Sequence, residues 1–284
     1  MKNVLLFFVT LFLMLSNINA QQWQSVTPLG YENAIFSSGC FVNDKEGWLF
    51  TTPLPFDNIE LLHTYDGAHT FERVLVLPYN YNCYKIQMLD SLFGYAKIEN
   101  DLAHEYYFWQ TLDGGRNWND ISDTSLFNIG RPLWSSSSFY FVNRNLGFFG
   151  GNNAIYKTVD AGENWLPMNT PSVIDSNYSN LWRVNSIYFT DDMHGWAACS
   201  LLIDVGFGMK TTDGGQNWTV CTPITGDLFG VHFADSLNGG MAGSGSFSAT
   251  VIGTQNNFDT LSYAYGYFWN QYANSICYQN DSTI

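Results

Sequence analysis

The chain has 284 residues, and its 25 acidic residues outnumber its 11 lysines and arginines, which gives a formal net charge of −14 at pH 7. This charge opposes binding to nucleic acid or anionic lipid through general electrostatics. Aromatic residues make up 17% of the chain and charged residues only 13%. Such a composition favours many short, half-buried strands over amphipathic helices, so we expect an all-β fold.

The first 20 residues have the pattern of a signal peptide. Lys2 precedes a largely apolar run at residues 4–15, and Ala20 offers a small residue at the cleavage position. The run is too short for a comfortable bilayer span, although a membrane anchor or a buried strand is the alternative. We therefore predict that residues 1–20 are removed. The mature chain is expected to have no transmembrane segment and to be secreted, periplasmic or at the cell surface.

A short polar turn closed by an aromatic residue recurs along the chain, at residues 64–71, 111–118, 158–165 and 211–218, with a degenerate copy at 254–261. The opening threonines are at positions 64, 111, 158, 211 and 254, so the repeat period is close to 47 residues. This period suits the four-stranded blade of a β-propeller.

The chemistry of this repeated turn is structural. An aspartate in a turn can accept backbone hydrogen bonds, the adjacent glycine permits a positive φ, and the tryptophan can cover the turn. We expect the turn to join the last two strands of each blade. The residues predicted to build these turns are Asp66, Asp113, Asp160, Asp213, Trp118, Trp165 and Trp218.

These residues resemble the Asp-box, or BNR repeat, of β-propellers. Each copy follows a segment in which Asn or Asp precedes Gly by four residues, as in Asn143 to Gly147 and Asp191 to Gly195. The fuller unit is similar to the repeat of the photosystem II stability/assembly factor propellers, whose relatives are common in secreted bacterial proteins. That family is expected to bind through an arginine-rich surface, whereas this chain is acidic and poor in arginine.

The resemblance implies a propeller of four-stranded blades over residues 22–284, with about five full blades and parts of a sixth. The full blades are expected at about 35–77, 83–123, 137–169, 184–223 and 228–269. Residues 273–284 resemble the first strand of an incomplete blade, and residues 22–28 resemble an N-terminal strand that completes a blade. We therefore expect a fragment of a ring of 6–8 blades.

Five cysteines follow the predicted cleavage position, and no CxxC pair is present. An odd number leaves at least one thiol unpaired, and disulfides are permitted outside the cytoplasm. Cys199 and Cys221 fall in the same predicted blade, which makes them the pair to test for a disulfide.

A ligand site is expected on the end of the propeller opposite the repeated turns, where the longer connections lie. Ordinary solvated loops are the alternative interpretation. The candidate ligand-face residues are Asp57, Asp101, Arg131, Trp134, Tyr178, Trp182 and Arg183.

Two classes of function remain. Asp-boxes occur in sialidases and in some endoglucanases, but the few arginines give no clear cluster for a sialic acid carboxylate. The scattered histidines have no metal-ligand spacing, so no metal or other cofactor is predicted. The sequence favours a non-catalytic, monomeric module that binds a protein or a glycan. The alternative is a sialidase-like or other carbohydrate-active glycoside hydrolase.

Overall fold

The computed structural model describes residues 30–31, 34–52, 58–122, 138–151, 153–171, 182–201, 205–222, 226–245, 248–260 and 262–266. Within these ranges every helix or strand is a β-strand, so the expected all-β class is confirmed. The predicted signal peptide, the N-terminal strand at 22–28 and the incomplete blade at 273–284 lie outside the described residues.

The described strands form five antiparallel sheets of four strands each. The first sheet contains β1 (Phe36–Phe41), β2 (Gly47–Thr51), β3 (Ile59–Thr64) and β4 (Glu72–Leu77). The second contains β5 (Tyr81–Met88), β6 (Gly94–Asn100), β7 (Glu105–Thr111) and β8 (Asn119–Asp120). The third contains β9 (Phe139–Phe141), β10 (Gly147–Gly150), β11 (Ile155–Thr158) and β12 (Leu166–Pro167).

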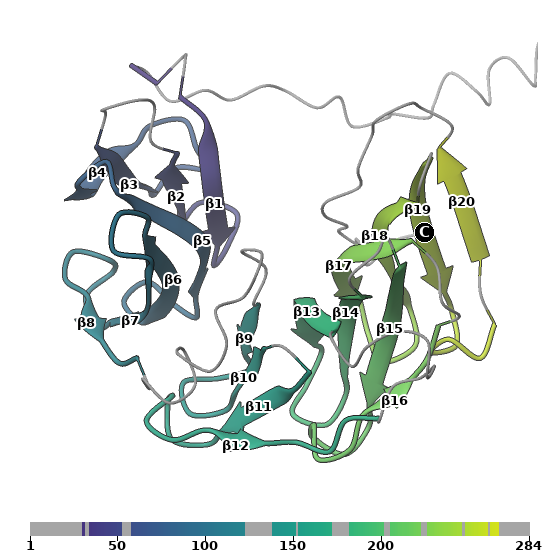
Figure 1. Ribbon diagram of the computed structural model, residues 1–284. Helices are drawn as coiled ribbons and strands as arrows, with labels where there is room; N and C mark the ends of the chain where they lie inside the picture. The colour runs from purple at the N-terminus through teal and green to yellow at the C-terminus, as the bar shows by residue number, and fades with distance from the viewer. Residues whose placement is uncertain are drawn as a thin grey trace, which may run out of the picture.

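The fourth sheet contains β13 (Trp182–Phe189), β14 (Gly195–Leu201), β15 (Val205–Thr211) and β16 (Thr219–Val220). The fifth contains β17 (Asp227–Phe233), β18 (Gly239–Gly245), β19 (Ser248–Thr254) and β20 (Ser262–Gly266). Strand order within every sheet follows the chain, and the sheets lie along an arc with β1, β5, β9, β13 and β17 on its inner side (Figure 1). This is the arrangement of blades in a β-propeller, which confirms the predicted fold.

The repeated turn is held by hydrogen bonds between its own residues. The Thr211 hydroxyl donates to Asp213 at 2.8 Å and accepts from the Gly215 N–H at 3.0 Å. The Asp213 carboxylate accepts from the backbone N–H of Asn217 at 3.0 Å and from its side-chain amide at 2.7 Å. These donors hold the pKa of Asp213 below its usual value.

The degenerate fifth copy folds in the same way. Asn256 replaces the aspartate, and its side-chain oxygen accepts from the Thr260 N–H at 2.8 Å. Asn257 and Phe258 have φ values of 55° and 67° at the places where other copies have glycine. Phe258 is buried and packs edge-on against Phe233. This core contact accompanies a positive φ that costs glycine nothing but is unfavourable for phenylalanine.

Each turn also binds the first hairpin of its own sheet. In the fourth sheet the Gly214 N–H donates to the Met193 carbonyl at 3.0 Å. Asp191 closes that hairpin by accepting from the N–H groups of Met193 and His194, both at 2.7 Å. The hairpin and the repeated turn therefore lie at one end of the sheet, which we call the turn end. The remaining connections lie at the opposite end, which we call the loop end.

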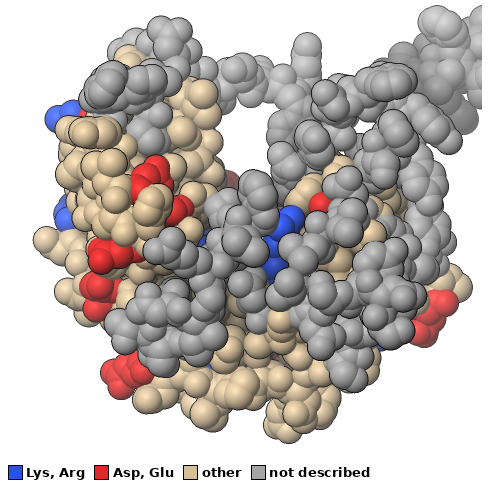
Figure 2. Space-filling view, viewed as in Figure 1, with Lys and Arg blue, Asp and Glu red and all other residues tan. Residues whose placement is uncertain are grey.

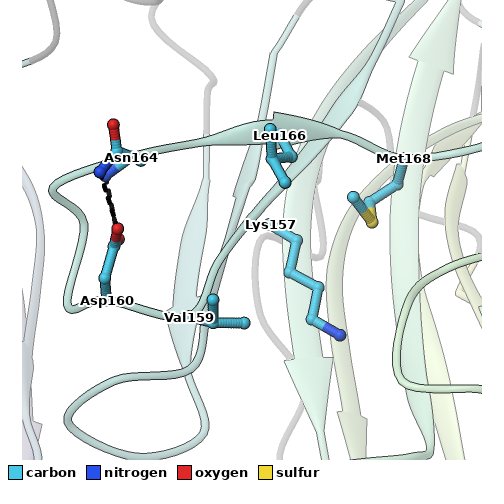
Figure 3. Close-up of a pocket in the computed structure, with 6 residues that line it drawn as sticks. All are labelled: Lys157, Val159, Asp160, Asn164, Leu166 and Met168. Atoms are coloured by element: carbon cyan, nitrogen blue, oxygen red, sulfur yellow. Dashed lines mark hydrogen bonds between the residues drawn. The ribbon is translucent and has the colours of Figure 1, made fainter.

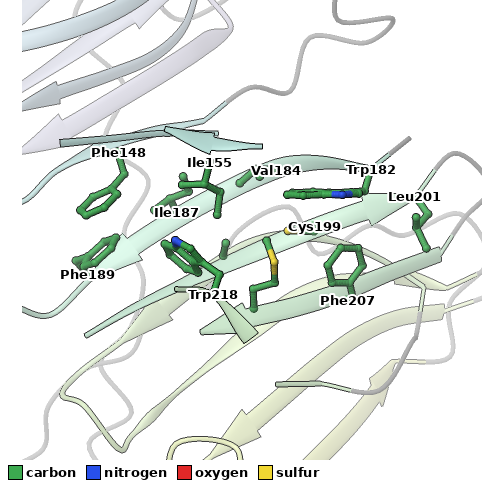
Figure 4. Packing of buried hydrophobic residues seen from close by; sticks show 12 residues of the cluster. Phe148, Ile155, Trp182, Val184, Ile187, Phe189, Cys199, Leu201, Phe207 and Trp218 are labelled. Carbon is green, nitrogen blue, oxygen red and sulfur yellow. The ribbon is translucent and has the colours of Figure 1, made fainter. Parts of the chain in front are cut away.

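Stacked aromatic rings join neighbouring sheets. Phe189 is the last residue of β13, and it pairs with Gly195, the first residue of β14. Its ring stacks on Phe148 of the third sheet, with centroids 4.0 Å apart and planes 11° apart (Figure 4). A Cβ atom on Gly195 would lie 2.4 Å from the Phe189 ring. Glycine is therefore needed here because the ring occupies the space of a side chain.

The same arrangement recurs at other sheet interfaces. Tyr95 of β6 stacks on Phe141 of β9 with centroids 3.6 Å apart, and Trp196 of β14 stacks on Phe233 of β17 at 3.7 Å. A Cβ atom on Gly147 or Gly239 would meet the phenylalanine of its own sheet at 2.6 Å or 2.2 Å. Each such pair adds about 0.5–1.5 kcal/mol to the stabilisation that comes from burial alone.

Cys199 and Cys221, the pair to test for a disulfide, are not bonded to each other. Both residues are free thiols, and they face opposite sides of the fourth sheet. Cys199 belongs to the core that contains Val184 and Phe207, whereas Cys221 packs on the cluster that contains Trp196. Both residues belong to one blade, but side chains along its strands alternate between the two faces of the sheet, and Cys199 and Cys221 lie on different faces.

We predict that Gly195→Ala lowers the free energy of unfolding by about 1–3 kcal/mol, because the added methyl group overlaps the Phe189 ring. Gly151→Ala is the matched control, since its Cβ would have an ordinary contact of 3.5 Å with Tyr156. Its effect should stay within about 0.5 kcal/mol. Denaturant unfolding measures both. Equal losses in the two variants would contradict the role assigned to the ring.

Candidate functional site

The structure locates three of the predicted ligand-face residues. Asp57, Arg131, Trp134 and Tyr178 lie outside the described residues. The prediction for Trp182 is wrong, because its side chain is only 4% exposed and packs edge-on against Phe207 in the core. It was expected in a loop, but it begins β13 and alternates inward with Val184. Arg183 is half-buried on that strand, and its role in binding stays a prediction.

Asp101 lies in a group of charged residues at the loop end of the second sheet. It follows β6, on which Lys97 and Glu99 occupy alternate positions and so share one face. Glu99 pairs with Asn82 on one neighbouring strand and with Tyr106 on the other, so these side chains belong to the same face. We call Tyr84, Lys97, Glu99, Asp101 and Tyr106 the charged cluster.

Lys97 is enclosed by aromatic rings. Its side chain is 1% exposed, and its Nζ atom lies 5.4 Å from the Tyr84 ring centroid and 5.3 Å from that of Tyr106. Such contacts stabilise a desolvated ammonium group. Burial lowers the pKa of Lys97 to about 8, while the negative charge of Glu99 acts to raise it. The ammonium is therefore charged at neutral pH.

Two carboxylates of the charged cluster have different surroundings. Glu99 is 8% exposed and accepts a hydrogen bond from the Tyr84 hydroxyl. Asp101 is exposed at the surface, yet desolvation and then the charge of Glu99 raise its pKa, against opposing effects of Asn82 and His104. Glu99 and Asp101 therefore differ in exposure, although they are only two residues apart.

A second lysine connects this cluster to the third sheet. Lys85 pairs with Lys97 in register, and its Nζ atom donates to the Ser138 hydroxyl at 3.2 Å. The same atom lies 5.3 Å from the Phe139 ring centroid, and burial lowers the pKa of Lys85 to about 8. The charged cluster therefore sits at the interface between the second and third sheets.

Sequence reasoning found Asp101 but missed the other members of the charged cluster. Asp101 was expected in a connecting loop, and it directly follows β6, which ends at Asn100, so Glu99 lies on the strand. The alternation of Lys97, Glu99 and Asp101 with Ile98 and Asn100 was the available signal. Charged residues in alternate positions of a strand that is buried on both sides are costly unless they are paired or serve a function.

A cavity of about 350 Å³ lies elsewhere, beside the repeated turn of the third sheet, and is lined by Lys157, Val159, Asp160, Asn164, Leu166 and Met168 (Figure 3). Its one carboxylate accepts hydrogen bonds from the Asn164 N–H at 2.9 Å and side chain at 2.8 Å. Asp160 is thus occupied in holding the turn, so the cavity offers no paired carboxylates.

Charge is unevenly distributed on the face shown in Figure 2. Acidic side chains lie mostly along the outer part of this face, and lysine or arginine atoms are visible near its centre.

Among the residues that the structure describes, no group of three His, Cys, Asp or Glu side chains could hold a metal ion. No helix within the described ranges is long and apolar enough to cross a membrane.

No protein-family model matches this sequence, and no curated protein matches it. Solved structures do share its fold. A GH74 enzyme from Niastella koreensis has a TM-score of 0.62 at 13% identity, covering 81% of this chain and 38% of the other. A GH74 xyloglucanase from Xanthomonas campestris has a TM-score of 0.59 at 15% identity, covering 87% and 41%. An ancestral GH74 enzyme has a TM-score of 0.54 at 14% identity, and the match covers 81% of this chain and 32% of that enzyme.

At these identities the similarity establishes a shared fold, and this chain spans about two fifths of the length of the first two structures. The comparison corrects the expectation that the chain is not an enzyme. All three of these similar structures are GH74 glycoside hydrolases, whereas none of them is a non-catalytic binding module.

We predict that the Lys97 ammonium loses its proton near pH 8, which nuclear magnetic resonance titration of its side chain would show. Glu99→Gln should lower this midpoint further, because it removes the negative charge that stabilises the ammonium. Glu163→Gln is the control, since Glu163 lies exposed in the turn of the third sheet. A midpoint near the ordinary lysine value would contradict the enclosed geometry.

Proposed function

We propose that this chain is part of a glycoside hydrolase that acts on a neutral polysaccharide of the xyloglucan kind. The observation that carries the proposal is the pair Glu99 and Asp101, two carboxylates in contrasting surroundings at the loop end of a propeller blade. The fold shared with GH74 enzymes, one of them a xyloglucanase, supports the reaction class and the substrate.

In this proposal Asp101 is the general acid. Its raised pKa allows it to keep a proton and donate it to the oxygen of the leaving sugar. Two carboxyl groups in different surroundings are the usual basis for dividing acid and base roles, and here Glu99 is buried whereas Asp101 is exposed. The exposed position of Asp101 gives it access to a polymer at the surface.

Glu99 is the partner carboxylate. It lies beside the Lys97 ammonium and accepts a hydrogen bond from Tyr84, so its orientation is held from two directions. It would either activate a water molecule or attack the anomeric carbon directly. The separation of the two carboxyl groups in the substrate complex selects between these routes, which invert or retain the configuration of the sugar.

The remaining features of the proposal concern the setting of the enzyme. A signal peptide at residues 1–20 would export the chain to where plant polysaccharides occur, and a monomer suffices for the site. The hydrogen bonds of Thr211 and Asp213, repeated in the other turns, support their assignment as Asp-boxes. The similarity to photosystem assembly propellers rests on the repeat pattern and carries no photosynthetic role.

The test is release of reducing ends from xyloglucan by the purified protein, with starch as the control polymer. Glu99→Gln and Asp101→Asn should each lower kcat/KM by about 10²–10⁴-fold, the usual effect of losing a general acid or base. Because Asp101 must be protonated, activity should fall as the pH rises through its raised pKa.

Glu163→Gln and Asp192→Asn are matched controls, because both residues are exposed acids on the turn end of other sheets. Both variants should keep full activity. A wild-type protein that binds xyloglucan without hydrolysing it would contradict the proposal. Full activity in Glu99→Gln would contradict the assignment of the site.

A further inference from the structure

The opposite face of the second sheet carries three aromatic rings. Tyr81 begins β5, and Tyr107 and Trp109 occupy alternate positions on β7. The ring centroids of Tyr81 lie 6.4 Å from Tyr107 and 6.2 Å from Trp109, and those of Tyr107 and Trp109 lie 6.2 Å apart. All three side chains are half-buried, so part of each ring is accessible. We call them the aromatic triad.

The triad is separate from the charged cluster. Tyr107 pairs with Ile98 on β6, whereas Glu99 pairs with Tyr106, so the two groups face opposite sides of the same sheet. The triad rests on the buried core between the first and second sheets, which contains Trp48 and Ile98. That support holds the rings in place, which lowers the entropy lost when a ligand binds.

Carboxylates flank the rings. The Tyr107 hydroxyl donates a hydrogen bond to Glu105, and Asp120 pairs in register with Trp109. Glu105 and Asp120 both contribute to the raised pKa of Tyr107. These groups offer acceptors for the hydroxyl groups of a ligand, and their charge disfavours an anionic polymer.

The loops beside the triad are joined to each other. The Asp101 N–H donates to the Asn80 carbonyl at 2.8 Å, and the Asn80 side-chain amide donates to Asn100 at 2.8 Å. Tyr79, which precedes this contact, is 47% exposed. The loop end of the second sheet therefore presents rings on one side and the carboxylates Glu99 and Asp101 on the other.

We propose that the aromatic triad is a binding site for the sugar rings of a neutral polysaccharide chain. Sugar rings present apolar faces to aromatic side chains while their hydroxyl groups need acceptors. The planes of the triad are tilted by 33–44° from one another, and all three rings belong to one face of the second sheet. A ligand such as a quaternary ammonium prefers rings that enclose it. The choice of xyloglucan as the polymer rests on the proposed function, whereas the assignment of the triad as a sugar-binding site rests on its own geometry.

The test uses the full chain with both Glu99→Gln and Asp101→Asn, so that no substrate is consumed. Binding of a xyloglucan oligosaccharide is measured by calorimetry. Tyr107→Leu should raise Kd about tenfold, because it removes the ring. Tyr107→Phe should have a smaller effect, since it removes only the hydroxyl that bonds to Glu105. Tyr65→Leu, at an exposed tyrosine on the turn end, is the control and should leave Kd unchanged.

The outcomes separate this inference from the proposed function. Weaker binding in Tyr107→Leu, with an unchanged thermal unfolding midpoint, supports the triad even if the wild type hydrolyses nothing. Equal binding in Tyr107→Leu and wild type overturns it, even if hydrolysis is observed. Absence of xyloglucan binding, or tighter binding of choline or polygalacturonate at the triad, also overturns it.

Discussion

The stacking of aromatic rings at three of the four interfaces between neighbouring described sheets is the interaction on which the rest of this structure depends. Phe189 lies over Gly195 of its own sheet and stacks on Phe148 of the preceding one. The ring needs both partners, because the glycine makes room for it and the neighbouring aromatic covers it. A single four-stranded sheet cannot bury its two faces alone, so stability comes from repeating this contact between neighbours.

The division between the two ends of each sheet follows from the same repeat. At the turn end the aspartate of each repeated turn is engaged in holding that turn, as in the hydrogen bonds of Asp213 with Thr211 and Asn217. The loop end has no such obligation. In the second sheet it carries Lys97, Glu99 and Asp101, and the contact of Lys85 with Ser138 anchors that end to the third sheet. The loop end of the second sheet thus gathers charged side chains beside a neighbouring sheet.

Sequence reasoning predicted the fold because the repeat is local: a threonine, an aspartate and glycines recur at nearly constant spacing. It placed the site less well because the residues at which strands begin and end depend on pairing with neighbouring strands, not on the local sequence alone. Trp182 was expected among the connections, but it begins β13 and is buried in the core. Glu99 was not among the predicted site residues, and it lies on β6 next to its end. Glu99 and Asp101 are only two residues apart, so their alternation was visible in the sequence. What the sequence did not reveal is that β6 extends to Asn100 and brings both residues to its loop end.

The central claim is that the charged cluster of the second sheet holds a polysaccharide at Glu99 and Asp101. A crystal structure of the Glu99→Gln, Asp101→Asn double variant with a xyloglucan oligosaccharide tests it most directly. The account predicts a glycosidic oxygen within hydrogen-bond distance of position 101, with the anomeric carbon facing position 99. An oligosaccharide bound between other carboxylates would contradict the account.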